Sequence, residues 1–442
     1  MLKDESLRDL KKIFFQSLQY FTSLIIVRFI TALNSIYLAR FLLSEKFGIY
    51  SLINQLINLL TFFMGFGIPT IITKFIAQTK NEKKILEKTY GTAQVLIILI
   101  SSFIIFIYFF ISIPLAYNIY QKPFLLKYFR LIIFLLFFIT FNNFWTGVLQ
   151  GLKAIKHISL ITVIYNLVSF PLIFIFAHRY ELVGAIIALT LANLLGVILF
   201  LITIKKFDLL KTAFQLPIVK NIINLSFPTF LSGLVMVPAL WLINTKLAIV
   251  KNFSEVAYFN ITNTFFQFLL FIPIAIGMPL TPTIAEEVNN LEKIKFFLSK
   301  IINYLNFLFL FLLILIFSFS SKIIFLIFGK DYLPAIKAFL FVIGSIIPAS
   351  IGYIFGYYLT GTGKMWLATF FNGLWFFLLV GVFFLFNYKW GALGAGISFY
   401  IAYFFQAFLM IIYFRNLLKK PLFILKILIL NLIVIIIFYK LL

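Results

Sequence analysis

Long apolar stretches alternate with short polar ones along almost the whole chain. Most apolar stretches exceed the roughly 18 residues that a helix needs to cross a bilayer, and none shows the alternating segments of a membrane β-barrel. Short connections rich in charge, Gly or Pro separate them. The pattern predicts thirteen membrane helices, at residues 15–40, 47–72, 90–113, 124–148, 158–177, 183–204, 221–249, 256–280, 298–319, 334–359, 366–386, 391–413 and 422–440.

Three short motifs occur twice, which indicates an internal repeat. A Ser-Glu dipeptide and a Gly-x-Pro tripeptide each recur after 210 residues, and a Gly-Ala dipeptide recurs after 207. Membrane proteins built from two repeats commonly bind their substrate between them. The paired segments are 44–45 with 254–255, 67–69 with 277–279, and 184–186 with 391–393.

The repeat divides the predicted helices into two halves. We expect an N-terminal six-helix half at residues 1–206, a C-terminal six-helix half at 207–420, and one additional membrane helix at 421–442. Each half has an even number of spans, so the two repeats would run parallel. The predicted fold class is an all-α polytopic membrane protein.

Composition and charge agree with a membrane location. The chain is 63% hydrophobic, whereas soluble domains are about half apolar. A net charge of +24 would suggest nucleic acid in a soluble protein, but here Lys and Arg favour one set of connections, as cytoplasmic loops do. Residues 1–12 lack the order of a cleavable signal peptide. We expect a multi-pass protein of the inner (cytoplasmic) membrane, with a cytoplasmic N-terminus and no nucleic-acid partner.

Several kinds of chemistry have no support in the residues. The chain has no Cys, which excludes disulfides, thiol nucleophiles and thiolate metal sites. His157 and His178 fall in connections on opposite sides of the predicted membrane, and there is no Gly-rich phosphate loop ending in Lys-Ser/Thr. We therefore expect no metal, no cofactor and no enzymatic activity.

The most specific pattern lies in the first two predicted helices. It consists of Ala39-Arg40, Leu42 to Glu45, Phe47 to Tyr50 and Gly65 to Pro69. This pattern resembles the oligosaccharide flippase (O-antigen translocase) family, part of the superfamily that includes peptidoglycan-precursor flippases and multidrug and toxin extrusion antiporters. The resemblance implies two six-helix bundles that form a V-shaped cavity. It also implies transport of a polyprenyl-(di)phosphate-linked oligosaccharide to the outer leaflet by alternating access.

Such a substrate imposes physical requirements on its route. Each unpaired sugar hydroxyl moved into hydrocarbon costs about 2–7 kcal/mol, and a charged diphosphate costs more. The route therefore needs a hydrated groove with fixed cations and hydrogen-bonding side chains, open sideways for the lipid tail. Intramembrane cations and polar stripes are the features to seek in the sequence.

Arg28 is the strongest single candidate for binding the diphosphate. It falls near the middle of the first span, where Arg costs about 2.5–3.5 kcal/mol on insertion scales. Thr31 and Ser35 share its helix face. The alternatives are an Arg bonded to helix carbonyls, or one placed closer to the interface because the helix begins late.

A second group of cations is predicted towards the outer half of the membrane. These residues would form a cationic lining that attracts the anionic headgroup. The alternative is that they extend to the outer lipid headgroups, and that Arg40 pairs with Glu45. The group comprises Arg40, Lys46, Lys127, Arg130 and Lys246, with Lys251 as a weaker candidate.

Amide and hydroxyl side chains form stripes on three predicted helices. Asn54 and Asn58 share one face of the second helix, and Asn263 and Gln267 share one face of the eighth. Asn143 lies on the fourth helix. These residues would bind sugar hydroxyls, but interhelical hydrogen bonding explains them equally well.

Acidic residues are absent from the middle of every predicted span. A proton- or sodium-coupled exporter of cationic drugs usually needs a buried carboxylate, so this absence disfavours drug export. The outer connections are too short for a catalytic domain, which disfavours a membrane-embedded polysaccharide polymerase or glycosyltransferase. A passive scaffold is disfavoured because it has no use for the central Arg28. We expect a monomer whose partners are the lipid-linked oligosaccharide and membrane lipids, with a polymerase and glycosyltransferases of the same pathway as further candidates.

Overall fold

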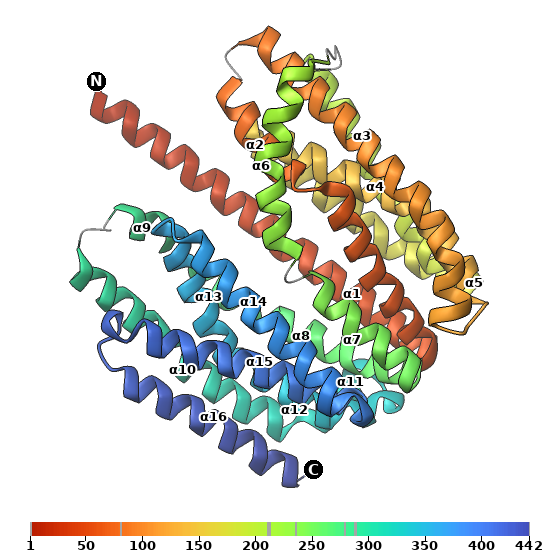
Figure 1. Ribbon diagram of the computed structural model, residues 1–442, viewed down its shortest axis with the longest axis vertical. Helices are drawn as coiled ribbons and strands as arrows, with labels where there is room; N and C mark the ends of the chain where they lie inside the picture. Colours follow the sequence, from red (N-terminus) through yellow and green to blue (C-terminus); the bar gives the residue numbers. More distant parts are fainter. Residues whose placement is uncertain are drawn as a thin grey trace. The chain divides into compact units, whose positions relative to one another are not determined.

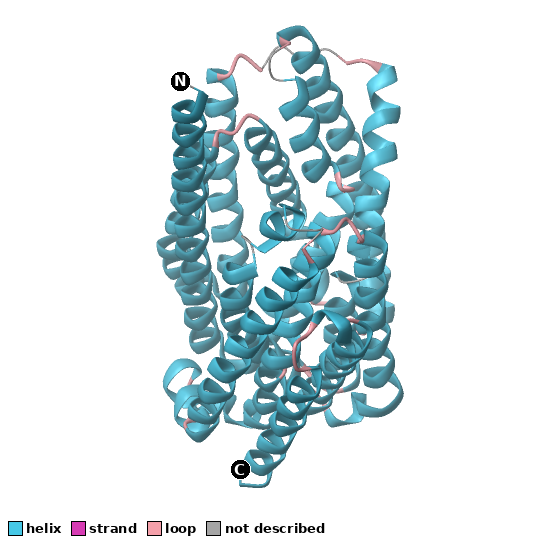
Figure 2. Cartoon of the chain, turned by 90° about the vertical axis from the view of Figure 1, so that its left-hand side faces the viewer, coloured by secondary structure: helices cyan, strands magenta, loops and turns pink. Residues whose placement is uncertain are grey.

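The computed structural model describes residues 2–79, 82–209, 214–234, 237–277, 280–286 and 290–441. Within these ranges the regular structure is helical throughout (Figures 1 and 2). Ten helical stretches in them are long and apolar enough to cross a membrane. The predicted all-α polytopic membrane fold is therefore confirmed.

The first part of the chain contains two long helices that are each divided by a bend. Leu43 (φ 60°) interrupts α1, and Glu181 (φ 50°) interrupts α5, so each supplies two of the predicted spans. A single π-helical turn at Leu115–Ile119 extends α3. The helices are α1 (Leu2–Gly65), α2 (Ile68–Thr79), α3 (Lys83–Pro114), α4 (Leu125–Gly151) and α5 (Ile155–Lys206).

In the second part, two predicted spans consist of two consecutive helices. The pairs α6 with α7, and α12 with α13, each occupy one predicted range, whereas α8 fills most of the range 256–280 and the short α9 begins at its end. The helices are α6 (Leu216–Leu234), α7 (Val237–Val250), α8 (Phe253–Gly277), α9 (Leu280–Glu286), α10 (Leu291–Ser318), α11 (Ser320–Phe328), α12 (Ile336–Gly344), α13 (Ile346–Gly361), α14 (Met365–Val382), α15 (Ala392–Tyr413) and α16 (Pro421–Leu441).

The last predicted helix is present as α16 although polar residues interrupt its sequence. Asn431 is buried in it, and its Oδ1 accepts a hydrogen bond of 2.9 Å from the hydroxyl of Tyr400 on α15. An amide that is paired in this way is tolerated in an apolar helix. With the two bends counted, helix occupies most of the described part of each of the thirteen predicted ranges.

The chain folds into two compact units. Unit 1 comprises Met1–Leu42 and Ile53–Val237, and unit 2 comprises Leu43–Leu52 and Pro238–Leu442. The ten residues after the bend at Leu43 therefore pack with the later part of the chain. The domain boundaries predicted after residues 206 and 420 concern the repeat and stay predictions.

The core of unit 1 depends on close contact between α2 and α4. Ile68, Ile72 and Ile76 recur every four residues and form the fully buried face of α2. A Cβ added at Gly147 of α4 would overlap the carbonyl oxygen of Pro69, and the hydroxyl of Thr73 donates to the Gly147 carbonyl over 2.9 Å. The small residue lets the two backbones approach, as is common between membrane helices.

Backbone conformation bears on the register of the predicted internal repeat. Glu181 (φ 50°, ψ −126°) and Gly391 (φ 63°, ψ −137°) form the same bend and are 210 residues apart. An offset of 210 residues pairs Gly391 with Glu181, whereas the predicted 207-residue pairing of Gly184 with Gly391 does not align the two bends. At 210 residues Gly184 pairs with Gly394. In the 277–279 motif, Met278 and Pro279 lie outside the described residues.

The repeated Ser-Glu dipeptides meet at helix ends within unit 2. The hydroxyls of Ser44 and Ser254 lie 3.1 Å apart, and the backbone N–H of Ser44 donates to Asp331 Oδ2 over 2.6 Å. Glu255 Oε2 accepts the N–H of Ala392, at the start of α15, over 2.6 Å. The carboxylates of Asp331 and Glu255 thus accept backbone N–H groups that helix ends leave open.

A glycine substitution tests the packing of the residue 43–52 segment. A Cβ at Gly48 would overlap the carbonyl group of Phe253, so Gly48→Ala should destabilise the fold by about 3 kcal/mol or more. Gly356→Ala is the matched control, because a Cβ there meets nothing within 4 Å. We expect a clear fall in the melting temperature of the purified protein for Gly48→Ala alone. Equal melting temperatures would contradict this packing.

Candidate functional site

Arg28 lies on the face of α1 that points away from α5. The opposite face of α1 contacts α5 through hydrogen bonds of Ser23 with Ser159 (3.2 Å) and of Asn34 with Ser169 (2.8 Å). At 100° per residue, Arg28 is turned by more than 100° from both Ser23 and Asn34. Its side chain is exposed and makes no hydrogen bond or ion pair with the described residues. The alternative of an Arg bonded to helix carbonyls is therefore not what the structure shows.

Two further cations of unit 1 contact aromatic rings where α3 ends and α4 begins. Lys127 Nζ lies 4.7 Å from the ring centre of Tyr128, and the guanidinium carbon of Arg130 lies 5.0 Å from that of Phe109 on α3. Both side chains are exposed, as is that of Arg40. A cation–π contact contributes about 0.5–1 kcal/mol at exposed sites and leaves the charge uncompensated, so both groups can still bind an anion.

In unit 2, Lys246 is held by aromatic side chains, whereas Lys46 is exposed. Lys246 on α7 is partly buried, and its Nζ lies 5.5 Å from the ring centre of Phe384 and 4.9 Å from that of Tyr388. Phe384 belongs to a π-helical turn, Phe383–Asn387, that follows α14. Such turns are frequent at functional sites. These partners could not be predicted from the sequence, because Phe and Tyr are too abundant in this chain to be informative.

The predicted groove residues fall into buried and accessible groups. Asn58 and Asn143 are exposed, and Asn54 and Gln267 are partly buried. Asn263 is buried, and its Oδ1 has no hydrogen-bond partner among the described residues. Amides in accessible positions can donate to and accept from sugar hydroxyls. Asn54, Asn58 and Asn143 belong to unit 1, and Asn263 and Gln267 belong to unit 2.

Neighbouring amides join helices instead. Asn142 Nδ2 donates to the carbonyl oxygen of Asn193 on α5 over 3.0 Å, and Asn260 of α8 donates to Asn244 Oδ1 of α7. On the fourth and eighth predicted helices, a residue next to the predicted groove residues is therefore used for packing. The exposed cations are chemically suited to an anionic group, and the accessible amides to hydroxyls.

Two adjacent residues of α4 separate these roles. Asn142→Ala removes a buried interhelical hydrogen bond, so we expect a loss of about 0.6–1.7 kcal/mol and a lower melting temperature. Asn143→Ala should leave the melting temperature unchanged and lower the transport rate. Melting curves and transport rates of both variants provide the check. A stable and fully active Asn143→Ala would remove Asn143 from the route.

The fold is shared with known transporters. An inward-facing MATE multidrug resistance transporter of the MOP superfamily matches with a TM-score of 0.74 and 18% identity over 90% of this chain and 95% of the other. The lipid II flippase MurJ in an inward closed conformation matches with 0.72 and 13% identity, over 96% and 92%. A MOP superfamily transporter from Pyrococcus furiosus matches with 0.64 and 17% identity, over 91% and 95%.

Comparison of sequences identifies the family. No curated protein sequence matches the chain significantly. The model of the family described as polysaccharide biosynthesis protein matches residues 14–288, which is more than half of the 442 residues. This match confirms the predicted resemblance. The chain therefore belongs to the polysaccharide biosynthesis protein family and has the fold of MOP superfamily transporters.

Proposed function

We propose that the protein flips a polyprenyl-(di)phosphate-linked oligosaccharide from the cytoplasmic to the outer leaflet of the inner membrane. The N-terminus lies in the cytoplasm, and transport proceeds by alternating access through the predicted V-shaped cavity. The substrate supplies polysaccharide or glycoconjugate export. A polymerase and glycosyltransferases of the same pathway act beside the protein.

The unpaired Arg28 is the observation that supports this proposal most. An Arg in the middle of a membrane helix costs about 2.5–3.5 kcal/mol, and no described residue compensates its charge. A diphosphate does so, because a guanidinium binds phosphate oxygens with two parallel hydrogen bonds. The unfavourable free energy of this guanidinium in the membrane is offset when the substrate brings the counter-ion with it.

The distribution of acidic residues separates this proposal from drug export. Every acidic side chain that the structure describes lies at a helix end, at a bend or in a connection. A cationic drug would need a carboxylate in the route to replace its lost hydration. The fold is compatible with either cargo, since both a multidrug transporter and a lipid flippase share it. The family match and Arg28 favour the lipid-linked glycan.

Substitution of Arg28 tests the proposed function. The assay is flipping of a fluorescent polyprenyl-diphosphate oligosaccharide in proteoliposomes with equal amounts of folded protein. Hydrogen bonds to charged groups contribute about 1.5–3 kcal/mol, so Arg28→Ala should lower the rate about 10-fold or more. Arg28→Lys keeps the charge but not the paired geometry and should fall between Arg28→Ala and the wild type.

Arg179→Ala is the matched control for this experiment. Arg179 is also an exposed Arg, but it lies beside the bend of α5 and stacks on Tyr180 at 5.6 Å. Its substitution should leave flipping unchanged. A wild-type rate for Arg28→Ala would exclude Arg28 from substrate binding. The absence of flipping by the wild-type protein would contradict the proposed function itself.

A further inference from the structure

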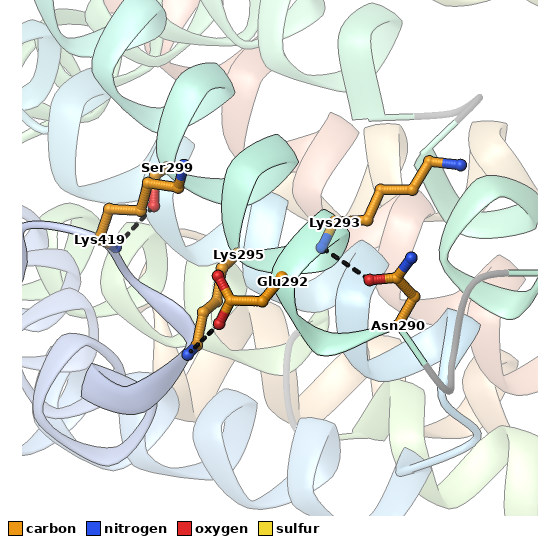
Figure 3. Close-up of polar contacts among 6 residues, drawn as sticks. All are labelled: Asn290, Glu292, Lys293, Lys295, Ser299 and Lys419. Atoms are coloured by element: carbon orange, nitrogen blue, oxygen red, sulfur yellow. Dashed lines mark hydrogen bonds and ion pairs between the residues drawn. The ribbon is translucent and has the colours of Figure 1, made fainter.

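A group of lysines gathers where α10 begins and where the chain enters α16 (Figure 3). The backbone N–H of Lys419 donates to the hydroxyl of Ser299 on α10 over 2.8 Å, which fixes the segment before α16 against α10. We call this group the lysine cluster. It consists of Lys293, Lys295, Lys300, Lys419 and Lys420.

The lysine cluster has more positive charge than its surroundings compensate. Glu292 pairs with Lys295 over 2.8 Å, as Figure 3 shows. Lys300 has no carboxylate partner among the described residues, and Lys419 forms no ion pair there but lies within electrostatic range of the same Glu292. Because like charges repel, this excess of positive charge is unfavourable unless an anion lies close to it.

Two of these ammonium groups are held near the same aromatic ring. Lys300 Nζ lies 5.4 Å and Lys419 Nζ 4.9 Å from the ring centre of Phe296. A ring attracts a cation through its negative face but carries no net charge. The two ammonium groups therefore lie no more than 10.3 Å apart, and both side chains are exposed.

An apolar stripe continues from the lysine cluster along α10. Lys300 is followed at helical spacing by Tyr304, Phe307 and Phe311, all of which are exposed. The ring centre of Phe307 lies 6.0 Å from that of Phe423 on α16, so the stripe borders the line where α10 and α16 meet. The chain before α16 repeats the same order, with Lys419 and Lys420 followed by Leu422 and Phe423.

We propose that the junction of α10 and α16 binds an anionic phospholipid of the surrounding membrane. The phosphate lies between Lys300 and Lys419, and an acyl chain follows Tyr304, Phe307 and Phe311. Charge at one end and apolar surface along the rest match the two parts of a phospholipid, and basic pockets between membrane helices are known to bind such headgroups. The lipid holds α16, the helix outside the predicted repeat, against α10. This inference does not depend on the transported substrate.

The other end of α10 offers an internal comparison. Lys322 of α11 lies 5.8 Å from the ring centre of Phe319, but it is a single cation on a single ring. Such an isolated contact is what is expected of a lysine that only extends to the lipid headgroup region. Lys322 therefore serves as the matched control for the lysine cluster.

Titration with lipid tests the proposal on the complete purified protein. Phosphatidylglycerol and phosphatidylcholine with identical acyl chains are added in detergent, and the melting temperature and the bound lipid, by native mass spectrometry, are measured. We expect phosphatidylglycerol to bind more tightly and to raise the melting temperature. A lysine near an anionic surface contributes about five-fold in affinity, so the Lys300→Gln/Lys419→Gln variant should bind about 30-fold more weakly.

Two further arms identify what is bound. Lys322→Gln should keep the wild-type affinity for phosphatidylglycerol, and inorganic phosphate at the same concentration should give no stabilisation because it has no acyl chain. Wild-type affinity in the double variant, or equal binding of phosphatidylcholine, would overturn the proposal. Equal stabilisation by inorganic phosphate would also overturn it, since the site would then recognise phosphate alone.

Discussion

The constraint on which this structure depends is that hydrocarbon does not solvate polar groups. An unpaired backbone amide costs several kcal/mol in the bilayer, and helices satisfy these groups within one segment. The side chains follow the same rule, since Asn142 pairs with Asn193, Asn260 with Asn244, and Asn34 with Ser169. Arg28 is an exception, because it is exposed and has no hydrogen-bond or ion-pair partner among the described residues.

Much of the fold could be predicted from this constraint alone. The lengths of the apolar stretches located the membrane helices. The polar residues in α16 do not interrupt that helix, because Asn431 is hydrogen-bonded to Tyr400. The bends could not be located in the same way. Leu43 and Glu181 have positive φ without being Gly, so the local sequence carries no signal for them and packing decides the conformation.

The candidate site was only partly predictable. Asn142 and Asn143 are adjacent and chemically identical, yet one is buried against α5 and the other is exposed. Helix periodicity separates their directions by 100°, but it does not say which direction faces a neighbouring helix. The partners of Lys246 were missed for a different reason. Phe384 and Tyr388 lie more than 130 residues away, and aromatic residues are common everywhere in this chain.

At the 210-residue offset, conformation is preserved where residue identity is not. A residue with φ near 50–60° begins the corresponding helical segment in both halves, and it is Glu181 in one and Gly391 in the other. At Gly391 a Cβ would meet the carboxylate of Glu255, and the positive φ favours Gly. Glu181 is exposed and adopts a sparsely populated backbone conformation, which costs about 1–3 kcal/mol. Since the two halves keep this costly bend through different residues, the helix packing on either side of it, and not the local sequence, must determine the bend.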